Sequence, residues 1–225
     1  MNLATFSDSA APARPSSLTD SMALFLSPVI GYLIGSLPTA EWLGRMVGVD
    51  LRNEGSENPG TNNALRLGGP SLAAIVLLVE MTKGAIAVVL GGVLGGDVGA
   101  VLAAVGAAMG NVYNMYYGLK GGKGLGISIG TLFAIWPTVV LPVLAMMVAT
   151  VLITRSSGAA AIVTIVSLTI MAVLWMIFEW PMAWGIEPTH LLIVLSVGLG
   201  AVLWRKHWFD SPFSRQSPHS LLEQG

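Results

Sequence analysis

The chain has 225 residues, of which 54% are hydrophobic and only 10% are charged, with a mean hydropathy of +0.74 and a formal net charge of −1. So much apolar surface would aggregate in water but suits a lipid bilayer, so the composition excludes a water-soluble domain and indicates an integral membrane protein. The chain has no cysteine, which excludes both a disulfide framework and a thiol nucleophile.

The two ends of the chain differ from the apolar middle. Residues 1–21 are rich in Ala, Ser, Pro and Thr and lack the basic segment of a signal peptide, which predicts a disordered, uncleaved N-terminal tail. Residues 209–225 show no periodicity and predict a cytoplasmic C-terminal tail. The multi-helix membrane domain is therefore expected at 22–208.

The apolar runs are separated by polar or Gly/Pro breaks at intervals of about 20 residues, the length of a membrane-spanning helix. We expect an all-α fold with about seven transmembrane helices, near residues 22–46, 71–92, 98–118, 124–137, 138–154, 158–178 and 189–204. Trp136-Pro137 interrupts the region 124–154, whose two arms of about 15 residues would each be only about 22 Å long. Two full spans and a re-entrant hairpin both remain open for this region.

The basic residues predict the orientation of these spans. With seven spans, one side of the membrane collects nine of the eleven basic residues, namely Arg45, Arg52, Arg66, Lys120, Lys123, Arg155, Arg205, Lys206 and Arg215. Cytoplasmic loops carry the excess of Lys and Arg, so this side is expected to be cytoplasmic. The N-terminus is then outside, and the C-terminus is cytoplasmic.

Two Gly-rich, basic loops on that side carry the functional signal. The first is DLRNEGSENPGTNN (residues 50–63), continuing to Arg66, and the second is KGGKG (residues 120–124). Glycine lets backbone N–H groups approach an anion, Arg and Lys give charge-assisted bonds, and Ser, Thr and Asn give neutral donors and acceptors. Both loops are typical of phosphate binding.

One charged pair lies within an apolar span. Glu80 and Lys83 are three residues apart, so on a helix they share a face, and the cost of charge in a membrane predicts that they pair and point into the bundle. A purely structural pair and a pair that shapes a substrate cavity both remain open.

Several other motifs are expected to be structural. Gly126-Ile-Ser-Ile-Gly130 matches a nucleophile elbow, but that motif needs a strand-to-helix turn, so close helix packing is favoured. The loop before Lys123 fails the spacing of a nucleotide-binding P-loop. The three histidines have no ligand spacing, so no metal is expected, and His207 is interpreted as an interfacial residue at lipid headgroups.

Four further motifs follow one another along the chain. They are GVDLRN-x-GS-x-NPG-x-x-N-x-LRLGG (48–69), E-x-x-KG (80–84), GN-x-Y-x-x-YYGLKGGKG (110–124) and SSGAAAIVT (156–164). In order and spacing they resemble the PlsY family of bacterial acyl-phosphate:glycerol-3-phosphate acyltransferases. The resemblance runs from about residue 31 to residue 208. It implies a seven-helix enzyme of the bacterial plasma membrane that works in phospholipid biosynthesis, with its active-site loops in the cytoplasm.

The implied reaction moves an acyl chain from acyl phosphate to the 1-hydroxyl of glycerol 3-phosphate, giving lysophosphatidate and phosphate. The resemblance implies no cofactor, and the expected partners are the two substrates and bilayer lipids, not nucleic acid. The positions matching the family's catalytic residues are Ser56, Arg66, Lys123 and Asn111. The positions matching phosphate-binding or supporting loop residues are Arg52, Gly55, Asn58, Gly60, Asn62, Asn63, Lys120, Gly121, Gly122 and Gly124.

The chain departs from the family pattern at a few of these positions. The family usually has histidine at Asn111, glycine at Glu57, threonine at Asn62, and an R-H-x-x-N-I pattern where this chain has residues 205–210. An amide cannot titrate near neutral pH, so a general-base role is lost at Asn111. The alternative to a working acyltransferase is an impaired homologue that binds acyl phosphate or anionic lipid as a regulator or partner.

Overall fold

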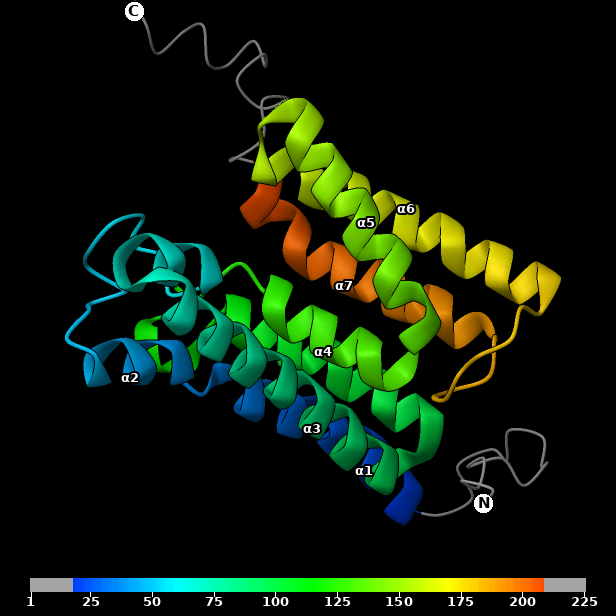
Figure 1. Cartoon of the computed structure of the whole chain (residues 1–225). Coiled ribbons are helices and arrows are strands. Elements are labelled where there is room, and N and C mark those ends of the chain that lie inside the picture. The colour runs from blue at the N-terminus through cyan, green and yellow to red at the C-terminus, as the bar shows by residue number, and fades with distance from the viewer. Residues whose placement is uncertain (1–17, 209–225) are drawn as a thin grey trace, which may run out of the picture.

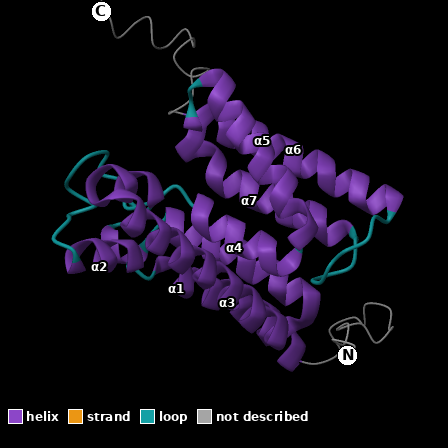
Figure 2. Ribbon diagram, viewed as in Figure 1, coloured by secondary structure: helices purple, strands orange, loops and turns teal. Residues whose placement is uncertain are grey.

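The computed structural model describes residues 18–208, and within that range the chain is helical with connecting loops and no strand (Figure 2). The elements are α1 (Leu18–Ser36), α2 (Thr39–Met46), α3 (Thr61–Val112), the 3-10 turn η1 (Met115–Tyr117), α4 (Leu125–Ile135), α5 (Pro137–Thr154), α6 (Ser157–Phe178) and α7 (His190–Trp208). The all-α prediction is confirmed. Helix α1 already includes the last four residues of the tail predicted at 1–21, while the predicted tail at 209–225 lies outside the described residues.

The outer surface of the helices confirms a membrane protein. Within residues 18–208, five helical stretches are long and apolar enough to span a bilayer. Large apolar side chains point outward, with Phe25 72%, Leu141 76% and Ile153 81% exposed, whereas the interior holds small residues such as Ala104 and Ala107 at 0%. Lipid tails are as apolar as these side chains, so large residues can face outward while small ones let helices approach closely.

Helix α3 is two antiparallel membrane helices joined by a short break. Its backbone leaves the helical region at Gly69, and again at Gly95 and Gly96, where Gly69 and Gly96 have φ values of 79° and 59°. Because Gly91 lies against Gly99, the arms 70–94 and 97–112 run back along each other. These arms correspond to the spans predicted at 71–92 and 98–118, and the second ends earlier because residues 113–124 form a loop.

The region 124–154 forms two helices that meet at Trp136. Helix α5 has the length of a span, but α4 has only 11 residues and is therefore about 16 Å long. Together with α1, the two arms of α3, α6 and α7, they make seven apolar helical segments in the described range. The number that crosses the membrane completely stays a prediction.

The structure divides the span predicted at 22–46 into two helices. The helix stops at Ser36, and α2 starts separately at Thr39. Pro38 causes the break, because its ring removes a backbone donor and disfavours helical geometry at Leu37. The short helix buries Ala40 and Glu41 and leaves Trp42 51% exposed, so it lies beside the bundle as a separate element.

Close packing of α1 against the second arm of α3 sets the position of both helix ends. Gly31 and Gly35 face the carbonyls of Ala103 and Ala107, and a Cβ atom at either glycine would overlap the facing backbone. From the other side, the glycines at positions 106 and 110 meet the backbone of α1 in the same way. Small residues at this spacing allow backbone contact between membrane helices.

This packing gathers the polar elements at one end of the bundle. Figure 1 shows α2, the loop before α3, the loop between α3 and α4, and the end of α7 at one end. The start of α1, the break at 95–96 and the loop between α6 and α7 lie at the other end. The two Gly-rich loops, more than 50 residues apart in sequence, therefore share one end of the molecule.

We expect Gly35→Ala to destabilise the bundle by about 1–3 kcal/mol, because the added methyl group overlaps a backbone carbonyl that cannot rotate away. Thermal unfolding in detergent measures this change. Gly92→Ala is the matched control, since its methyl group would make an ordinary 3.7 Å contact with the Ala100 side chain. Equal stability of the two variants would contradict the packing argument.

Candidate active site

The first Gly-rich loop begins with a turn closed by Asp50. One carboxylate oxygen accepts the backbone N–H groups of Arg52 and Asn53 at 3.0 and 3.1 Å, and the other accepts the Asn53 side chain at 2.8 Å. This last hydrogen bond is the main cause that lowers the pKa of the Asp50 carboxyl below its usual value of 3.8. Asp50 is therefore ionised at neutral pH and holds the loop in a tight turn.

The amide of Asn63, at the start of α3, fixes the rest of this loop. Its Nδ2 group donates to the carbonyls of Leu51 and Glu54, and its Oδ1 atom accepts from the Ser56 backbone, each at 2.9 Å. A Cβ atom at Gly55, where φ is 67°, would overlap Asn63 Oδ1. Asn63 is buried, so it shapes the predicted phosphate loop from inside.

The second Gly-rich loop is tied to the end of α3 by its backbone. The N–H groups of Gly121 and Gly122 donate to the carbonyls of Val112 and Asn111 at 3.0 and 2.9 Å. A Cβ atom at Gly121 would overlap the Asn111 carbonyl, and Gly124 begins α4 in the left-handed conformation. Glycine is required here because the loop lies directly on another backbone.

Helix α7 supports the same loop from the other side. Lys206 Nζ donates to the Gly121 carbonyl at 3.0 Å, and His207 Nε2 lies 3.1 Å from the Lys123 carbonyl. The interpretation of His207 as an interfacial residue was wrong, because its side chain is buried and only 1% exposed. Packing of α7 on α3 brings it inside, which the hydropathy of α7 alone does not reveal.

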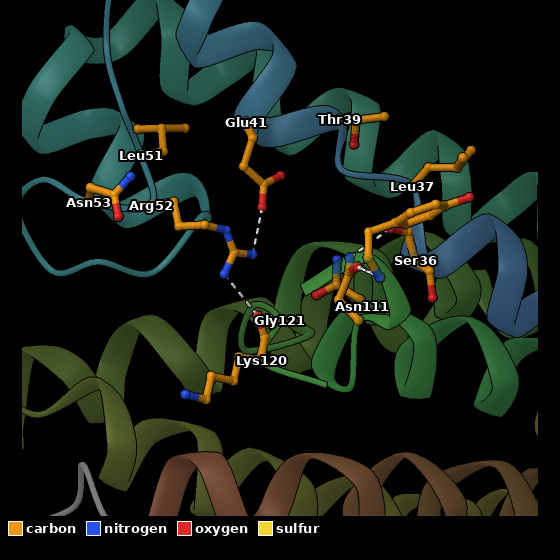
Figure 3. Close-up of polar contacts among 12 residues, drawn as sticks. Ser36, Leu37, Thr39, Glu41, Leu51, Arg52, Asn53, Asn111, Lys120 and Gly121 are labelled. Atoms are coloured by element: carbon orange, nitrogen blue, oxygen red, sulfur yellow. Dashed lines mark hydrogen bonds and ion pairs between the residues drawn. The ribbon is translucent and has the colours of Figure 1, made fainter. Parts of the chain in front are cut away.

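Arg52 connects the two loops and α2 (Figure 3). Its guanidinium donates to Glu41 Oε1 at 2.9 Å and to the Lys120 carbonyl at 3.1 Å, and it lies 3.5 Å from the centre of the Tyr117 ring. An arginine fork that also stacks on an aromatic ring is held in one place. Two of its groups are thus used by the protein, and phosphate binding by Arg52 stays a prediction.

The predicted pair Glu80 and Lys83 does form on the first arm of α3, buried where the linker after α1, α2 and the second arm of α3 meet it. Lys83 Nζ lies 3.0 Å from Glu80 Oε1, which also accepts from the Thr39 hydroxyl at 2.8 Å. Lys83 donates further to the Leu37 carbonyl at 2.8 Å, and Asn111 Nδ2 donates to Glu80 Oε2 at 2.6 Å. Asn111 is therefore engaged with a buried carboxylate.

The two loops meet at Gly122. A Cβ atom there would lie 3.0 Å from Asn111 Oδ1, 3.5 Å from the Pro59 carbonyl and 3.8 Å from Asn58 Oδ1. Within residues 18–208, Asn58 Oδ1 is a buried acceptor with no hydrogen-bond partner. Such an atom is costly unless a donor reaches it, so it marks a place where a ligand donor fits.

The other predicted residues surround this junction. Gly60 precedes α3 with extended backbone. Within the described range, no hydrogen bond or ion pair engages the exposed side chains of Ser56, Asn62, Arg66 and Lys120. Residues 18–208 contain no cluster of His, Asp or Glu that could hold a metal ion.

Sequence reasoning missed the residues that support the site from a distance. Thr39 and Glu41 fall within the span predicted at 22–46, and Tyr117 falls within the span predicted at 98–118. The proline at position 38 was the available signal for the first two, because it predicts that a helix breaks there. No local signal indicates that Tyr117 stacks on Arg52.

An apolar groove lies on the membrane-facing side of the first arm of α3 (70–94). It is lined by residues of that arm and of α4, including Leu78, Met81, Ile86, Val89, Leu90 and Phe133, and has a volume of about 390 Å³. Leu78 and Val89 are 65% and 60% exposed, so the groove opens sideways. Its lining includes Met81, the residue that follows Glu80 in the chain.

Comparison with known proteins places these features in a family. The model of the glycerol-3-phosphate acyltransferase family matches residues 25–210. A glycerol-3-phosphate acyltransferase of Agrobacterium fabrum is 36% identical over 185 residues, covering 82% of this chain and 84% of the relative, and one of Bordetella avium is 34% identical over 197 residues, covering 84% and 90%. The chain belongs to the glycerol-3-phosphate acyltransferase family.

Solved structures of the family agree with the fold. The chain is similar to a crystal structure of PlsY, an integral membrane glycerol 3-phosphate acyltransferase, in its glycerol 3-phosphate form, with a TM-score of 0.68 and 26% identity. The lysophosphatidic acid form gives a TM-score of 0.70 and 25% identity. Each comparison covers 86% of this chain and 91% of the other.

One departure from the family pattern has a structural consequence. Glu57 has a φ of 55°, in the left-handed region that side chains other than glycine rarely adopt. The family's usual glycine takes this conformation without strain, whereas a glutamate costs about 1–2 kcal/mol. Glu57 also adds an exposed negative charge beside a predicted anion-binding loop.

We expect Asn63→Ala to destabilise the first loop, because three backbone groups lose their partner and the buried Leu51 carbonyl alone costs about 1–3 kcal/mol when it is left unpaired. Hydrogen–deuterium exchange of residues 51–58 should become faster. Asn62→Ala is the control, since the neighbouring amide is exposed and engages no described group. Equal exchange in the two variants would show that Asn63 does not hold the loop.

Proposed function

We propose that this chain transfers an acyl group from acyl phosphate to the 1-hydroxyl of glycerol 3-phosphate, a step of phospholipid biosynthesis. The observation that carries the proposal is the junction at Gly122, where both phosphate-type loops meet above the unpartnered Asn58 acceptor. Both substrates carry a phosphate, and glycerol 3-phosphate also carries hydroxyl donors. The family membership supports the acceptor, and the loop chemistry supports two phosphates at one site.

The proposed chemistry needs positioning more than a protein nucleophile. The acceptor hydroxyl oxygen bonds to the acyl carbon, the anhydride C–O bond breaks, and phosphate leaves with the proton. Acyl phosphate already has a good leaving group, so orientation and stabilisation of negative charge are the main requirements. Lys123, Arg66 and Ser56 are the proposed contributors, and Asn111 does not serve as a base because an amide does not titrate.

The apolar groove is the proposed place for the acyl chain. Its wall contains aliphatic and aromatic side chains from α3 and α4, and its side opening faces the surface where lipid tails would lie. A chain lying there would bring its phosphate end toward the polar end of the bundle, near Glu80. Entry from the bilayer avoids moving the apolar chain through water.

We propose further that the protein lies in the bacterial plasma membrane and that its site faces the cytoplasm. Support comes from the predicted positive side, because the loops with Arg52, Lys120 and Lys123 share one end of the bundle with the basic end of α7 (Figure 1). Basic residues are enriched on the cytoplasmic side of membrane proteins. The start of α1 lies at the opposite end.

The direct test supplies purified protein with palmitoyl phosphate and glycerol 3-phosphate. The expected products are lysophosphatidate and phosphate in equal amounts, with no product from palmitoyl-CoA as the donor. Activity with palmitoyl-CoA alone would overturn the proposed donor. No product from either donor, together with retained binding of glycerol 3-phosphate, would favour the impaired homologue.

If Lys123 and Arg66 hold substrate phosphate, alanine at either position should cost about 2–4 kcal/mol of transition-state stabilisation, or roughly 30- to 1000-fold in kcat/KM. Phosphate release under steady-state conditions measures this loss. Arg155→Ala is the control, because Arg155 is also exposed and basic but lies at the turn between α5 and α6. If kcat/KM fell by only a few-fold in Lys123→Ala and Arg66→Ala, the two residues would be interfacial anchors and not phosphate ligands.

The orientation can be tested with single cysteines, because the chain has none of its own. We expect Ala183→Cys, in the exposed loop between α6 and α7, to react with an impermeant thiol reagent on intact cells. Asn53→Cys, in the exposed first loop, should react only after permeabilisation. The opposite pattern would reverse the orientation and move the site outside the cytoplasm.

A further inference from the structure

Glu80 is a buried carboxylate whose two oxygens have different surroundings. Glu80 and Lys83 are only 7% and 5% exposed, within an apolar bundle. Oxygen Oε1 accepts from Lys83 and from Thr39, which is enough to neutralise and fix that side. Oxygen Oε2 accepts from Asn111 at 2.6 Å, and this contact points away from the ion pair toward the end of α3.

The contact with Glu80 decides how the Asn111 amide is turned. Because Nδ2 donates to Glu80, the other end of the amide, Oδ1, faces Gly122, where a Cβ atom would lie 3.0 Å away. The backbone carbonyl of Asn111 also accepts the Gly122 N–H at 2.9 Å. One residue therefore meets the KGGKG loop with both its backbone and its side chain.

The contacts run in sequence from the ion pair to the loop. Lys83 pairs with Glu80, Glu80 accepts from the Asn111 side-chain amide, and the backbone carbonyl of Asn111 accepts the Gly122 N–H. An ion pair kept only for folding requires nothing from Asn111, and a buried pair is by itself weak evidence for stability. The hydrogen bond from Asn111 to Glu80 instead connects the buried charge to the residue that contacts the candidate phosphate loop.

We propose that Glu80 is a positioning residue that sets the geometry of the loop 120–124 through Asn111. The role rests on the proposed function, in which this loop holds the phosphate of glycerol 3-phosphate. Glu80 does not touch substrate; it fixes the Asn111 amide, and the amide fixes the loop. Loss of the carboxylate turns the amide and displaces the loop, and binding of the phosphate substrate weakens.

The variants Glu80→Gln and Asn111→Ala test this link from both ends. Glutamine keeps an oxygen for Lys83 and Thr39 but places an NH2 group against Asn111 Nδ2, so the two donors oppose each other. Asn111→Ala leaves the pair of Glu80 and Lys83 intact. Each variant should raise the KM for glycerol 3-phosphate about tenfold with a smaller change in kcat, because the loop is misplaced while the reacting groups remain.

The double variant Glu80→Gln with Asn111→Ala distinguishes positioning from independent effects. If Glu80 acts through Asn111, the double variant has a KM no higher than the larger single effect. A KM increase in the double variant equal to the product of the two single increases would overturn the proposal. So would a KM unchanged in both single variants, with only the amount of folded protein reduced.

Ser36→Ala is the matched control. Ser36 is fully buried, and its hydroxyl donates to the carbonyl of Gly110, the residue before Asn111, at 3.2 Å. Its loss should lower the melting temperature while the KM stays within about twofold, because neither Glu80 nor the Asn111 side chain is touched. A KM increase as large as that of Glu80→Gln would show that any loss of packing here has the same effect.

Hydrogen–deuterium exchange of residues 119–124 tests the link without turnover. The Gly121 and Gly122 amides should exchange faster in Asn111→Ala and in Glu80→Gln than in the wild type. Their exchange should not change in Ser36→Ala. If the wild type shows no acyl transfer, the proposed function fails while this measurement still decides the positioning role. Unchanged exchange in Asn111→Ala, which keeps the buried ion pair, overturns the proposal even if Glu80→Gln does not fold.

Discussion

The buried carboxylate of Glu80 is the constraint on which the polar end of the bundle depends. A charge in an apolar interior must be paired and hydrogen-bonded, or it is neutralised at high cost. Its partners come from both arms of α3 and from α2. Its counter-ion Lys83 also donates to the Leu37 carbonyl, in the linker after α1. Satisfying this ion pair therefore fixes where four segments meet, and the break at Pro38 is what lets Thr39 reach Glu80 and Leu37 reach Lys83.

Glycine contacts extend this arrangement outward to the loops. Along α1 and the second arm of α3, glycines place backbone against backbone, so the ends of the two helices have little freedom. The end of α3 then offers the carbonyls of Asn111 and Val112 to the KGGKG loop, and α7 covers the same loop through Lys206 and His207. The loop is rigid because its backbone is held on both sides, while Lys120 remains exposed to solvent.

The departures from the family pattern fall on this same framework. Asn111 donates a hydrogen bond to Glu80 but brings no titratable group of its own. Glu57 takes a left-handed conformation and adds charge beside the first loop. The first change removes a titratable side chain, whereas the second adds strain and negative charge, so the two affect the site in different ways.

The sequence by itself determined the membrane class, the apolar segments and both Gly-rich loops, because a bilayer demands long apolar helices and the polar, glycine-rich stretches interrupt them. It also determined that Glu80 and Lys83 pair, since they are neighbours on one helix face. Only the tertiary structure decided the Glu41–Arg52 bridge, the burial of His207 and the contact between Glu80 and Asn111. These contacts join separate helices through close packing, and no local pattern encodes which side chains then meet.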